Sequence, residues 1–268
     1  MRFAAVILAA AGASSASAAL FHHAGSAPRA PAITLRKRVH VNTLITTPDT
    51  IDIEWGGAFS VDGGFTLPAT IHFTPEGHHI WWGRTELSAS FDSLASSADP
   101  LGRVTHFGDR IGLAATCVVH DGDQLDIAFA PQLSVLLRGD DGVRAGATAI
   151  ARYDSGRSST GVTATWSAAN HPSPTNPAGT IDVGFGSGFR LKSAGPLSHL
   201  TPHFNAVYER STGVERQISI FEGVEYQIVD ALAVDFSAQH LNVWGGQLDH
   251  QVVVGLTVST GRLHAHHQ

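Results

Sequence analysis

The chain has 268 residues, of which 43% are hydrophobic and 15% are charged, whereas a charged fraction of about 25% is usual for soluble proteins. Its formal net charge is -6, so no surplus of basic side chains exists to hold nucleic-acid phosphates. Cys117 is the one cysteine, which excludes an intrachain disulfide.

The first 18 residues have the features of an export signal. A short positively charged start precedes an apolar run at 3–11, and Ala16-Ser17-Ala18 offers a small-residue cleavage site. A buried N-terminal helix is the alternative, but no amphipathic period follows the apolar run. We therefore predict a signal peptide at 1–18. We predict a linker or periplasmic segment at 19–49, which contains the basic cluster 36–38.

From residue 50 onward the sequence predicts strands, because apolar and polar residues alternate with period 2. No run of about 18 apolar residues occurs, so no transmembrane helix is predicted. Most segments approach the length of about 9–11 residues with which a tilted strand crosses a bilayer, whereas soluble strands average about 5–6. The twelve predicted strands are 51–59, 65–74, 80–92, 110–119, 125–137, 144–153, 161–168, 180–191, 201–209, 217–228, 231–241 and 251–258.

The last three predicted strands show the alternation most clearly. In 231–241 one face holds Leu232, Val234 and Phe236, and the other holds Asp235 among small and polar residues. An apolar face opposite a small, polar and acidic face is typical of a transmembrane barrel, with lipid outside and water inside. Three residues do not fit this alternation: Glu222 on an apolar face, and Phe221 and Val253 on polar faces.

We therefore predict an all-β fold, an antiparallel transmembrane β-barrel of about 12 strands over residues 50–258, followed by a His-containing tail at 259–268. A soluble sandwich or lipocalin-like barrel is the alternative, and its solvent-facing residues should include many lysines. Lys192 is the only lysine after residue 38, which favours the transmembrane barrel.

The predicted connections support the same arrangement. Links after even-numbered strands are mostly short, such as Asp121-Gly122-Asp123, whereas 93–109 and 169–179 after odd-numbered strands are predicted as long loops. Short periplasmic turns and long outer loops are typical of bacterial outer-membrane barrels. An even strand count places both chain ends on the periplasmic side.

Eight stretches between residues 45 and 258 carry a family resemblance. They are 51–59 (IDIEWGGAF), 81–94 (WWGRTELSASFDSL), 107–110 (FGDR), 146–154 (GATAIARYD), 175–186 (TNPAGTIDVGFG), 200–203 (LTPH), 220–226 (IFEGVEY) and 249–257 (DHQVVVGLT). Together they resemble the outer-membrane transporters grouped with the phenol-degradation MetA-pathway barrels. The resemblance implies a bacterial outer-membrane barrel for the passage of small molecules, aromatic ones included, and it implies no set of binding residues. The tail departs from the pattern, because such barrels commonly end on an aromatic residue that the assembly machinery reads.

Charged residues on the polar faces are the candidates for a functional lumen. Acid in excess would bias passage toward cations. The alternative is structural, with carboxylate–arginine pairs that fill a narrow interior. The candidates are Arg84, Glu86, Arg110, Asp126, Asp182, Glu225 and Asp235.

Catalytic and metal sites receive less support from the sequence. Ser and His are plentiful, but no G-x-S-x-G motif selects a nucleophile and base, so we predict no catalytic residue. The His pairs at 22–23 and 78–79 and the His residues of the tail lack the H-E-x-x-H and Cys-x-x-Cys patterns, so we predict no metal and no cofactor. The Ser and His residues considered are Ser88, Ser90, Ser219, Ser237, His72, His120, His203 and His240.

Aromatic residues near predicted strand ends indicate interfacial girdles. They are Trp55, Trp81, Trp82, Trp166, Trp244, Tyr153, Tyr208 and Tyr226. The predicted function is an outer-membrane transporter or channel for small solutes, aromatic or hydrophobic ones among them. Its predicted partners are outer-membrane lipid, the solute and the barrel-assembly machinery. A lipid- or ester-hydrolysing barrel and a soluble periplasmic barrel that binds a hydrophobic ligand are the alternatives.

Overall fold

The computed structural model describes residues 49–61, 64–75, 84–99, 102–106, 110–137, 142–173, 176–191, 195–214, 216–229, 231–244 and 248–260. The predicted signal peptide, nearly all of the predicted linker and most of the tail lie outside these ranges. Within them, no helix combines the length and the apolar character that a membrane crossing requires.

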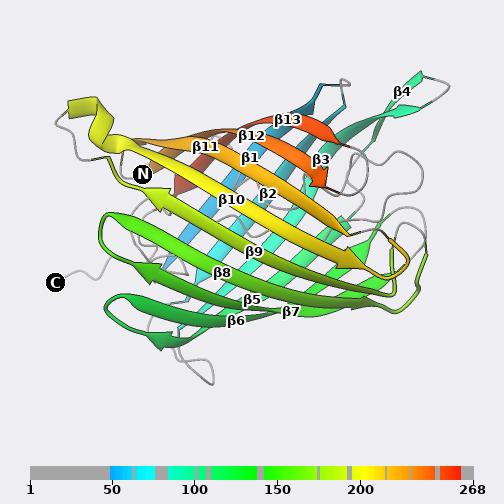
Figure 1. Cartoon of the computed structure of the whole chain (residues 1–268), viewed down its shortest axis with the longest axis horizontal. Coiled ribbons are helices and arrows are strands. Elements are labelled where there is room, and N and C mark those ends of the chain that lie inside the picture. Colours follow the sequence, from blue (N-terminus) through cyan, green and yellow to red (C-terminus); the bar gives the residue numbers. More distant parts are fainter. Residues whose placement is uncertain are drawn as a thin grey trace, which may run out of the picture.

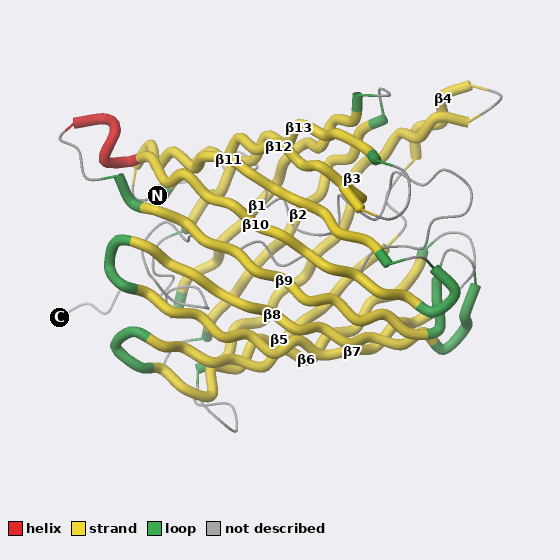
Figure 2. Tube along the Cα trace, in the orientation of Figure 1, coloured by secondary structure: helices red, strands yellow, loops and turns green. Residues whose placement is uncertain are grey.

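Strands make up nearly all of the described chain (Figure 2). A short 3-10 helix, η2 (Gly195–His199), precedes one of them and is the red segment in that figure. The strands are β1 (Thr50–Ser60), β2 (Phe65–Thr74), β3 (Thr85–Asp99), β4 (Gly102–His106), β5 (Arg110–Asp121), β6 (Leu125–Leu136), β7 (Val143–Asp154), β8 (Ser158–Ala169), β9 (Gly179–Phe189), β10 (Leu200–Ser211), β11 (Gln217–Val229), β12 (Leu232–Trp244) and β13 (Asp249–Ser259).

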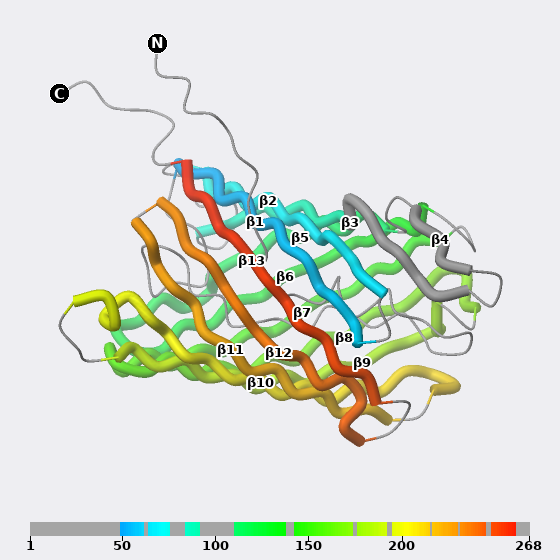
Figure 3. The backbone as a smooth tube through the Cα atoms, turned by 90° about the horizontal axis from the view of Figure 1, so that it is seen from above, coloured from blue at the N-terminus to red at the C-terminus, as the bar shows by residue number. Residues whose placement is uncertain are grey.

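The sheet closes on itself into a barrel whose strands run obliquely around the lumen (Figure 1). Each wall strand pairs antiparallel with the next along the chain, and β13 pairs antiparallel with β1 to complete the circle. Figure 3 shows β13 in red directly beside β1 in blue. β4 pairs only with the end of β3, so twelve of the thirteen strands form the wall.

The predicted barrel and its strand count are confirmed, with one correction. Most predicted strand boundaries agree with the structure within three residues. The predicted loop 93–109 is wrong in part, because β3 continues to Asp99 and returns as β4. This stretch carries no regular apolar alternation. The end of β3 pairs with β4 rather than with β5, and β4 is not one of the wall strands that require an apolar outer face.

The barrel has two rims, which we name by the chain ends. The terminal rim contains Asp49 and Thr260, and the short links 122–124 and 155–157 lie at the same rim. The far rim contains Leu137, Gly142 and the turn Thr212–Val214. The short turns that the sequence predicts therefore lie beside the chain ends, as expected for periplasmic turns.

The wall is apolar outside and polar inside. Phe236 on the outer face is 56% exposed, whereas Asp182 on the inner face is 4% exposed. Exposed large apolar residues recur at every second position, for example along β6, β9 and β13. A soluble barrel would place these side chains inside, so the pattern is that of a barrel surrounded by lipid.

The three residues that do not fit the alternation keep their unusual positions. Phe221 and Val253 are buried on the inner face, where Phe221 packs with Val207 and Leu241. Glu222 is exposed on the outer face, and its Oε1 lies 3.5 Å from His240 Nε2. Each of these residues therefore contacts side chains of the same character, apolar or polar, on a neighbouring strand.

Several predicted girdle aromatics lie near the rims on the outer face. Trp166 and Trp244 are exposed near the far rim, and Tyr153 and Tyr226 are exposed near the terminal rim. Trp55 instead lies in the middle of β1 opposite Leu256, so its assignment to a girdle is wrong. Trp81 and Trp82 lie outside the described residues.

A charge on the outer face should destabilise the barrel in proportion to its depth. Val254 is in the middle of β13 and 42% exposed, so Val254→Lys should lower the free energy of unfolding by about 2–4 kcal/mol in lipid vesicles. Val61 is 78% exposed beside the far rim, so Val61→Lys should cost at most about 1 kcal/mol. Denaturant unfolding in vesicles measures both, and equal costs would contradict a lipid-facing outer wall.

Candidate functional site

An acidic cluster surrounds a histidine on the inner face of β1, β2 and β3. His72 Nδ1 lies 2.9 Å from Glu86 Oε1, and His72 Nε2 lies 3.6 Å from Glu54 Oε2. All three side chains are buried within the barrel. Asp52 adjoins them in register with His72 and accepts a hydrogen bond from Ser259 Oγ at 2.7 Å. The imidazole therefore bridges carboxylates of two strands near the terminal rim.

A second cluster lies on β10, β11 and β12. Asp235 Oδ2 lies 3.5 Å from His203 Nε2, and Asp235 Oδ1 accepts a hydrogen bond from Ser237 Oγ at 3.1 Å. His203 and Ser237 flank Gly223 in register, one on each neighbouring strand. Because Gly223 has no side chain, His203 reaches across a whole strand to Asp235. Glu225 pairs in register with Asp235 and enlarges the acidic surface.

The His203 cluster contains the residue types of a catalytic triad in a different order. Nucleophilic catalysis by serine needs a histidine base hydrogen-bonded to the hydroxyl, with the carboxylate behind it. Here Asp235 lies between His203 and Ser237, and the serine hydroxyl donates its hydrogen bond to the carboxylate rather than to the imidazole. The geometry at this cluster therefore does not favour the hydrolytic alternative.

Arg144 organises the opposite side of the barrel at the far rim. It donates from Nη1 to Ser167 Oγ at 2.6 Å and to Thr180 Oγ1 at 3.1 Å, and from Nη2 to the Pro177 carbonyl. Its Nε lies 3.3 Å from Asn176 Oδ1. The buried guanidinium thus joins β7, β8 and β9 to the link between β8 and β9.

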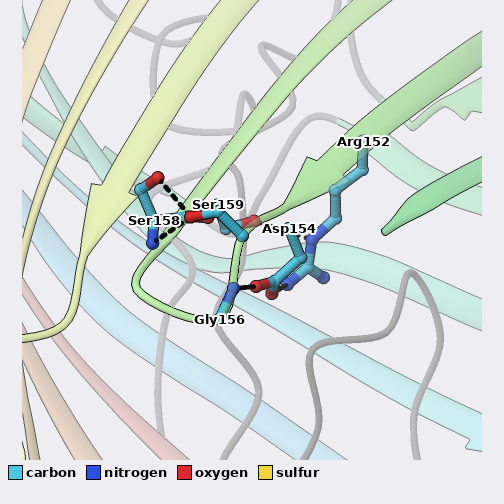
Figure 4. A network of polar contacts seen from close by, with 6 residues as sticks. Arg152, Asp154, Gly156, Ser158 and Ser159 are labelled. Carbon is cyan, nitrogen blue, oxygen red and sulfur yellow. Dashed lines mark hydrogen bonds and ion pairs between the residues drawn. The ribbon is translucent and has the colours of Figure 1, made fainter. Parts of the chain in front are cut away.

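A third polar network closes the turn between β7 and β8 at the terminal rim (Figure 4). Arg152 Nε donates to Ser159 Oγ at 2.7 Å, and its Nη2 lies 3.3 Å from Asp154 Oδ2. Asp154 Oδ1 also accepts the Gly156 N–H at 2.6 Å. Gly156 has φ of 77°, a conformation that favours glycine, so the carboxylate supports both the turn and the inward arginine.

The sequence-predicted lumen residues fall into three groups. Glu86, Asp126 and Asp182 are buried on the inner face. Glu225, Asp235 and Arg110 share the inner side of their strands and are half-buried. Arg84 precedes β3 at the terminal rim, where its Nη2 pairs with Asp121 Oδ2 at 2.5 Å. Their part in solute passage stays a prediction.

Charge is distributed unevenly around the lumen. The wall strands from β10 through β13 to β1–β3 contain one basic residue, Arg210, which is exposed on the outer side of β10. Arg110, Arg144 and Arg152 all belong to β5 and β7 on the other half. We call the inner carboxylates of the first half that lie toward the terminal rim the acidic wall. They are Asp52, Glu54, Glu86, Glu225 and Asp235.

Sequence reasoning included Glu86, Glu225 and Asp235 among the candidates but missed the histidines beside them. His72 and His203 were considered only as possible catalytic bases. In the structure both histidines lie on the inner face. Which carboxylates they contact depends on the register between neighbouring strands, which the sequence pattern does not give. Among described residues, no group of three or more His, Cys, Asp and Glu side chains is arranged to hold a metal ion. The His pairs at 22–23 and 78–79 lie outside the described ranges.

No protein-family model matches the sequence, and no curated protein matches it either. Solved structures do match. The KdgM porin in complex with disordered oligogalacturonate aligns with a TM-score of 0.53 at 9% identity over 78% of this chain and 98% of that one. The NanC porin aligns with a TM-score of 0.56 at 8% identity, again over 78% and 98%. The chain has the fold of an outer-membrane porin.

At these identities the likeness concerns the fold alone. It extends to nearly the whole of each porin, with 98% of each porin chain covered. The inner-face residues of this porin-like barrel have to be interpreted from its own structure.

The strand-crossing contact at Gly223 leads to a prediction. A Cβ at this position would lie 2.5 Å from Ser237 Cβ and 2.7 Å from both His203 Nε2 and the Phe236 carbonyl oxygen. Gly223→Ala should therefore separate His203 from Asp235 and lower the free energy of unfolding by about 1–3 kcal/mol.

Gly188 provides the matched control, because it also lies on the inner face beside His203. A Cβ there would meet its nearest atoms at 3.7–3.9 Å, so Gly188→Ala should leave stability nearly unchanged. Denaturant unfolding and the histidine NMR signals measure the two effects. Equal stability of the two variants would show that β11 does not approach its neighbours this closely.

Proposed function

We propose that this protein is an outer-membrane channel through which small solutes pass, and that its lumen favours cationic and neutral solutes over anions. The observation that carries the proposal is the acidic wall inside a barrel whose outer face is apolar. Carboxylates lining a low-dielectric passage raise the local concentration of cations and repel anions. Export by the predicted signal peptide, contact with lipid and insertion by the assembly machinery belong to the same proposal.

The finer identity of the solute is also part of the proposal. The sequence resemblance implies small aromatic or hydrophobic molecules. The cluster of Val207, Phe221 and Leu241 on the inner side of β10–β12 supports this, because the interior of the barrel is then not polar throughout. The proposal includes membership in the MetA-pathway type of barrel.

A soluble barrel that binds a hydrophobic ligand is the weaker candidate. Such a protein needs an apolar interior and a solvated exterior. Here the inner face carries buried carboxylates, arginines, serines and threonines, whereas Phe185, Phe189 and Phe236 are exposed outside. The distribution supports the membrane channel.

Ion selectivity tests the channel directly. The combined variant Glu54→Gln, Glu86→Gln, Glu225→Gln and Asp235→Asn removes most of the negative charge of the acidic wall. It should lower the cation-to-anion permeability ratio at least about twofold in planar bilayers at 0.1 M salt, where the Debye length is about 10 Å. The reversal potential in a KCl gradient measures the ratio.

Glu222→Gln is the matched control, since this carboxylate is exposed on the outer face. It should leave the reversal potential unchanged. At 1 M salt the Debye length falls to about 3 Å, so the difference between the variants should shrink. A permeability ratio that is the same with and without the four carboxylates would overturn the proposed selectivity.

A further inference from the structure

A separate pair of carboxylates lies on the inner face of the neighbouring strands β9 and β10 (Figure 1). Asp182 and Glu209 are partners in the register of these strands, and their exposed fractions are 4% and 6%. Asp182 is the fourth residue of β9, which begins at the far rim, so the pair is distinct from the acidic wall. Partners in register have Cβ atoms about 4.5–5.5 Å apart, so both carboxylates occupy one small region of the interior.

The burial of Asp182 is not offset by hydrogen bonds. Neither of its carboxylate oxygens has a hydrogen-bond partner among the residues that the structure describes. Glu209, by contrast, accepts a hydrogen bond from Ser211 Oγ at 3.2 Å. A buried carboxylate without partners is costly when ionised, and a second carboxylate beside it adds repulsion. Asp182 therefore needs either a cation or a proton.

Arg144 is close enough for its charge to act on Asp182, but it does not supply the missing contact. Its three nitrogens donate to uncharged oxygens of β8, of β9 and of the link between these strands. Two negative charges, from Asp182 and Glu209, and one positive charge, from Arg144, sum to a net charge of -1. One monovalent cation would neutralise this buried region, whereas a divalent cation would overcompensate it.

Hydroxyl oxygens lie beside the carboxylate of Asp182. Thr165 is its register partner on β8, and the Oγ1 of Thr165 lies 2.9 Å from Thr148 Oγ1. Thr163 Oγ1 extends over Gly184, the next inner residue of β9, because a Cβ at this glycine would lie 2.5 Å from that oxygen. Carboxylate and hydroxyl oxygens are the ligands that hard cations prefer. A proton would leave one oxygen of Asp182 without a donor, whereas a cation can contact both.

We propose that Asp182 and Glu209 bind one monovalent alkali-metal cation, such as Na⁺, on the inner face of β9 and β10. The hydroxyl oxygens of Thr163 and Thr165 are its further ligands. This site has two carboxylates and takes its other oxygens from threonines, so it differs from the clusters of three or more acidic, His or Cys side chains that the described residues lack. The bound cation joins β8, β9 and β10 and stabilises the folded barrel, whether or not solutes pass through it.

Unfolding in two salts of equal ionic strength tests the site in the full chain. A cation that binds only the folded protein multiplies the folding equilibrium constant by one plus the ratio of its concentration to its Kd. Replacing about 0.2 M choline chloride by NaCl should raise the folding constant at least about fivefold, which corresponds to a Kd of about 50 mM or below. Choline is the reference because it is too large for a buried pair of carboxylates. Urea unfolding in lipid vesicles measures the ratio.

Asp182→Asn locates the response to Na⁺. The variant keeps the shape of the side chain and removes its charge, so it should lose most of the increase in the folding constant. In choline chloride it should be at least as stable as the wild-type protein, because the buried charge is gone, and in NaCl it should be less stable. Glu222→Gln is the matched control, since this carboxylate is exposed on the outer face, and it should keep the full response. Thr165→Val removes one hydroxyl ligand and should reduce the response severalfold.

Each outcome decides for or against the cation site. A wild-type folding constant that is the same in both salts would overturn it, because Asp182 would then hold a proton. An equal response of the wild-type protein and Asp182→Asn would also overturn it, because Na⁺ would then bind elsewhere in the barrel. The wild-type comparison needs no variant, so it remains decisive even if a substitution prevents folding. Unfolding is measured without solute flow, so failure of the cation site leaves the proposed channel unaffected.

Discussion

Closure of the sheet between β1 and β13 is the constraint on which the rest of the structure depends. Lipid supplies no hydrogen-bond partners, so a sheet can cross a bilayer only if every edge is paired. The two strands pair over nine residues from Asp52–Ser259 to Ser60–Gln251. Side chains secure both ends of the seam, because Ser259 Oγ donates to Asp52 and Ser60 Oγ donates to Asp249, each at 2.7 Å.

The register of this seam also fixes which residues face the lumen. A shift of one residue would turn every carboxylate of β1 toward lipid and every apolar side chain inward. Burial of Asp52 and Glu54 beside outward Ile53 shows the observed register to be the one that suits a membrane. The register between β1 and β13 therefore determines that the carboxylates of β1 face the interior of the barrel.

Given that register, the two halves of the interior satisfy their charges in different ways. In β5–β9, Arg144 and Arg152 each bind acceptors on adjacent strands and links, so the guanidinium groups brace the wall. In the other half, carboxylates gather around His72 and His203. Histidine is a small partner with limited charge, so this half retains an acidic character that the arginine-bearing half does not have.

Most of the fold follows from the sequence, because period-2 alternation over ten or more residues is a strong signal. β2 has the same limits in sequence and structure, and β11 differs by one residue. The β3–β4 arm was missed because its sequence carries no regular apolar alternation, and β4 pairs with β3 alone. The His203–Asp235 contact was missed for a different reason. It joins residues across an intervening strand and exists because Gly223 lies between them, which only the registers of two strand pairs reveal.

Residues that break the alternation are informative when they are considered with their neighbours. Phe221 on the inner face packs with Val207 and Leu241, which come from the strands on either side. Glu222 on the outer face lies beside His240, whose Nδ1 is 2.8 Å from His250 Nδ1. A polar side chain facing lipid, or an apolar side chain facing a polar interior, costs free energy when it has no partner. The cost is smaller when neighbouring side chains of the same character contact it. Residues that break the alternation in a barrel sequence therefore indicate which strands are neighbours. Matching such residues on consecutive strands would predict the register between the strands, which the alternation alone does not determine.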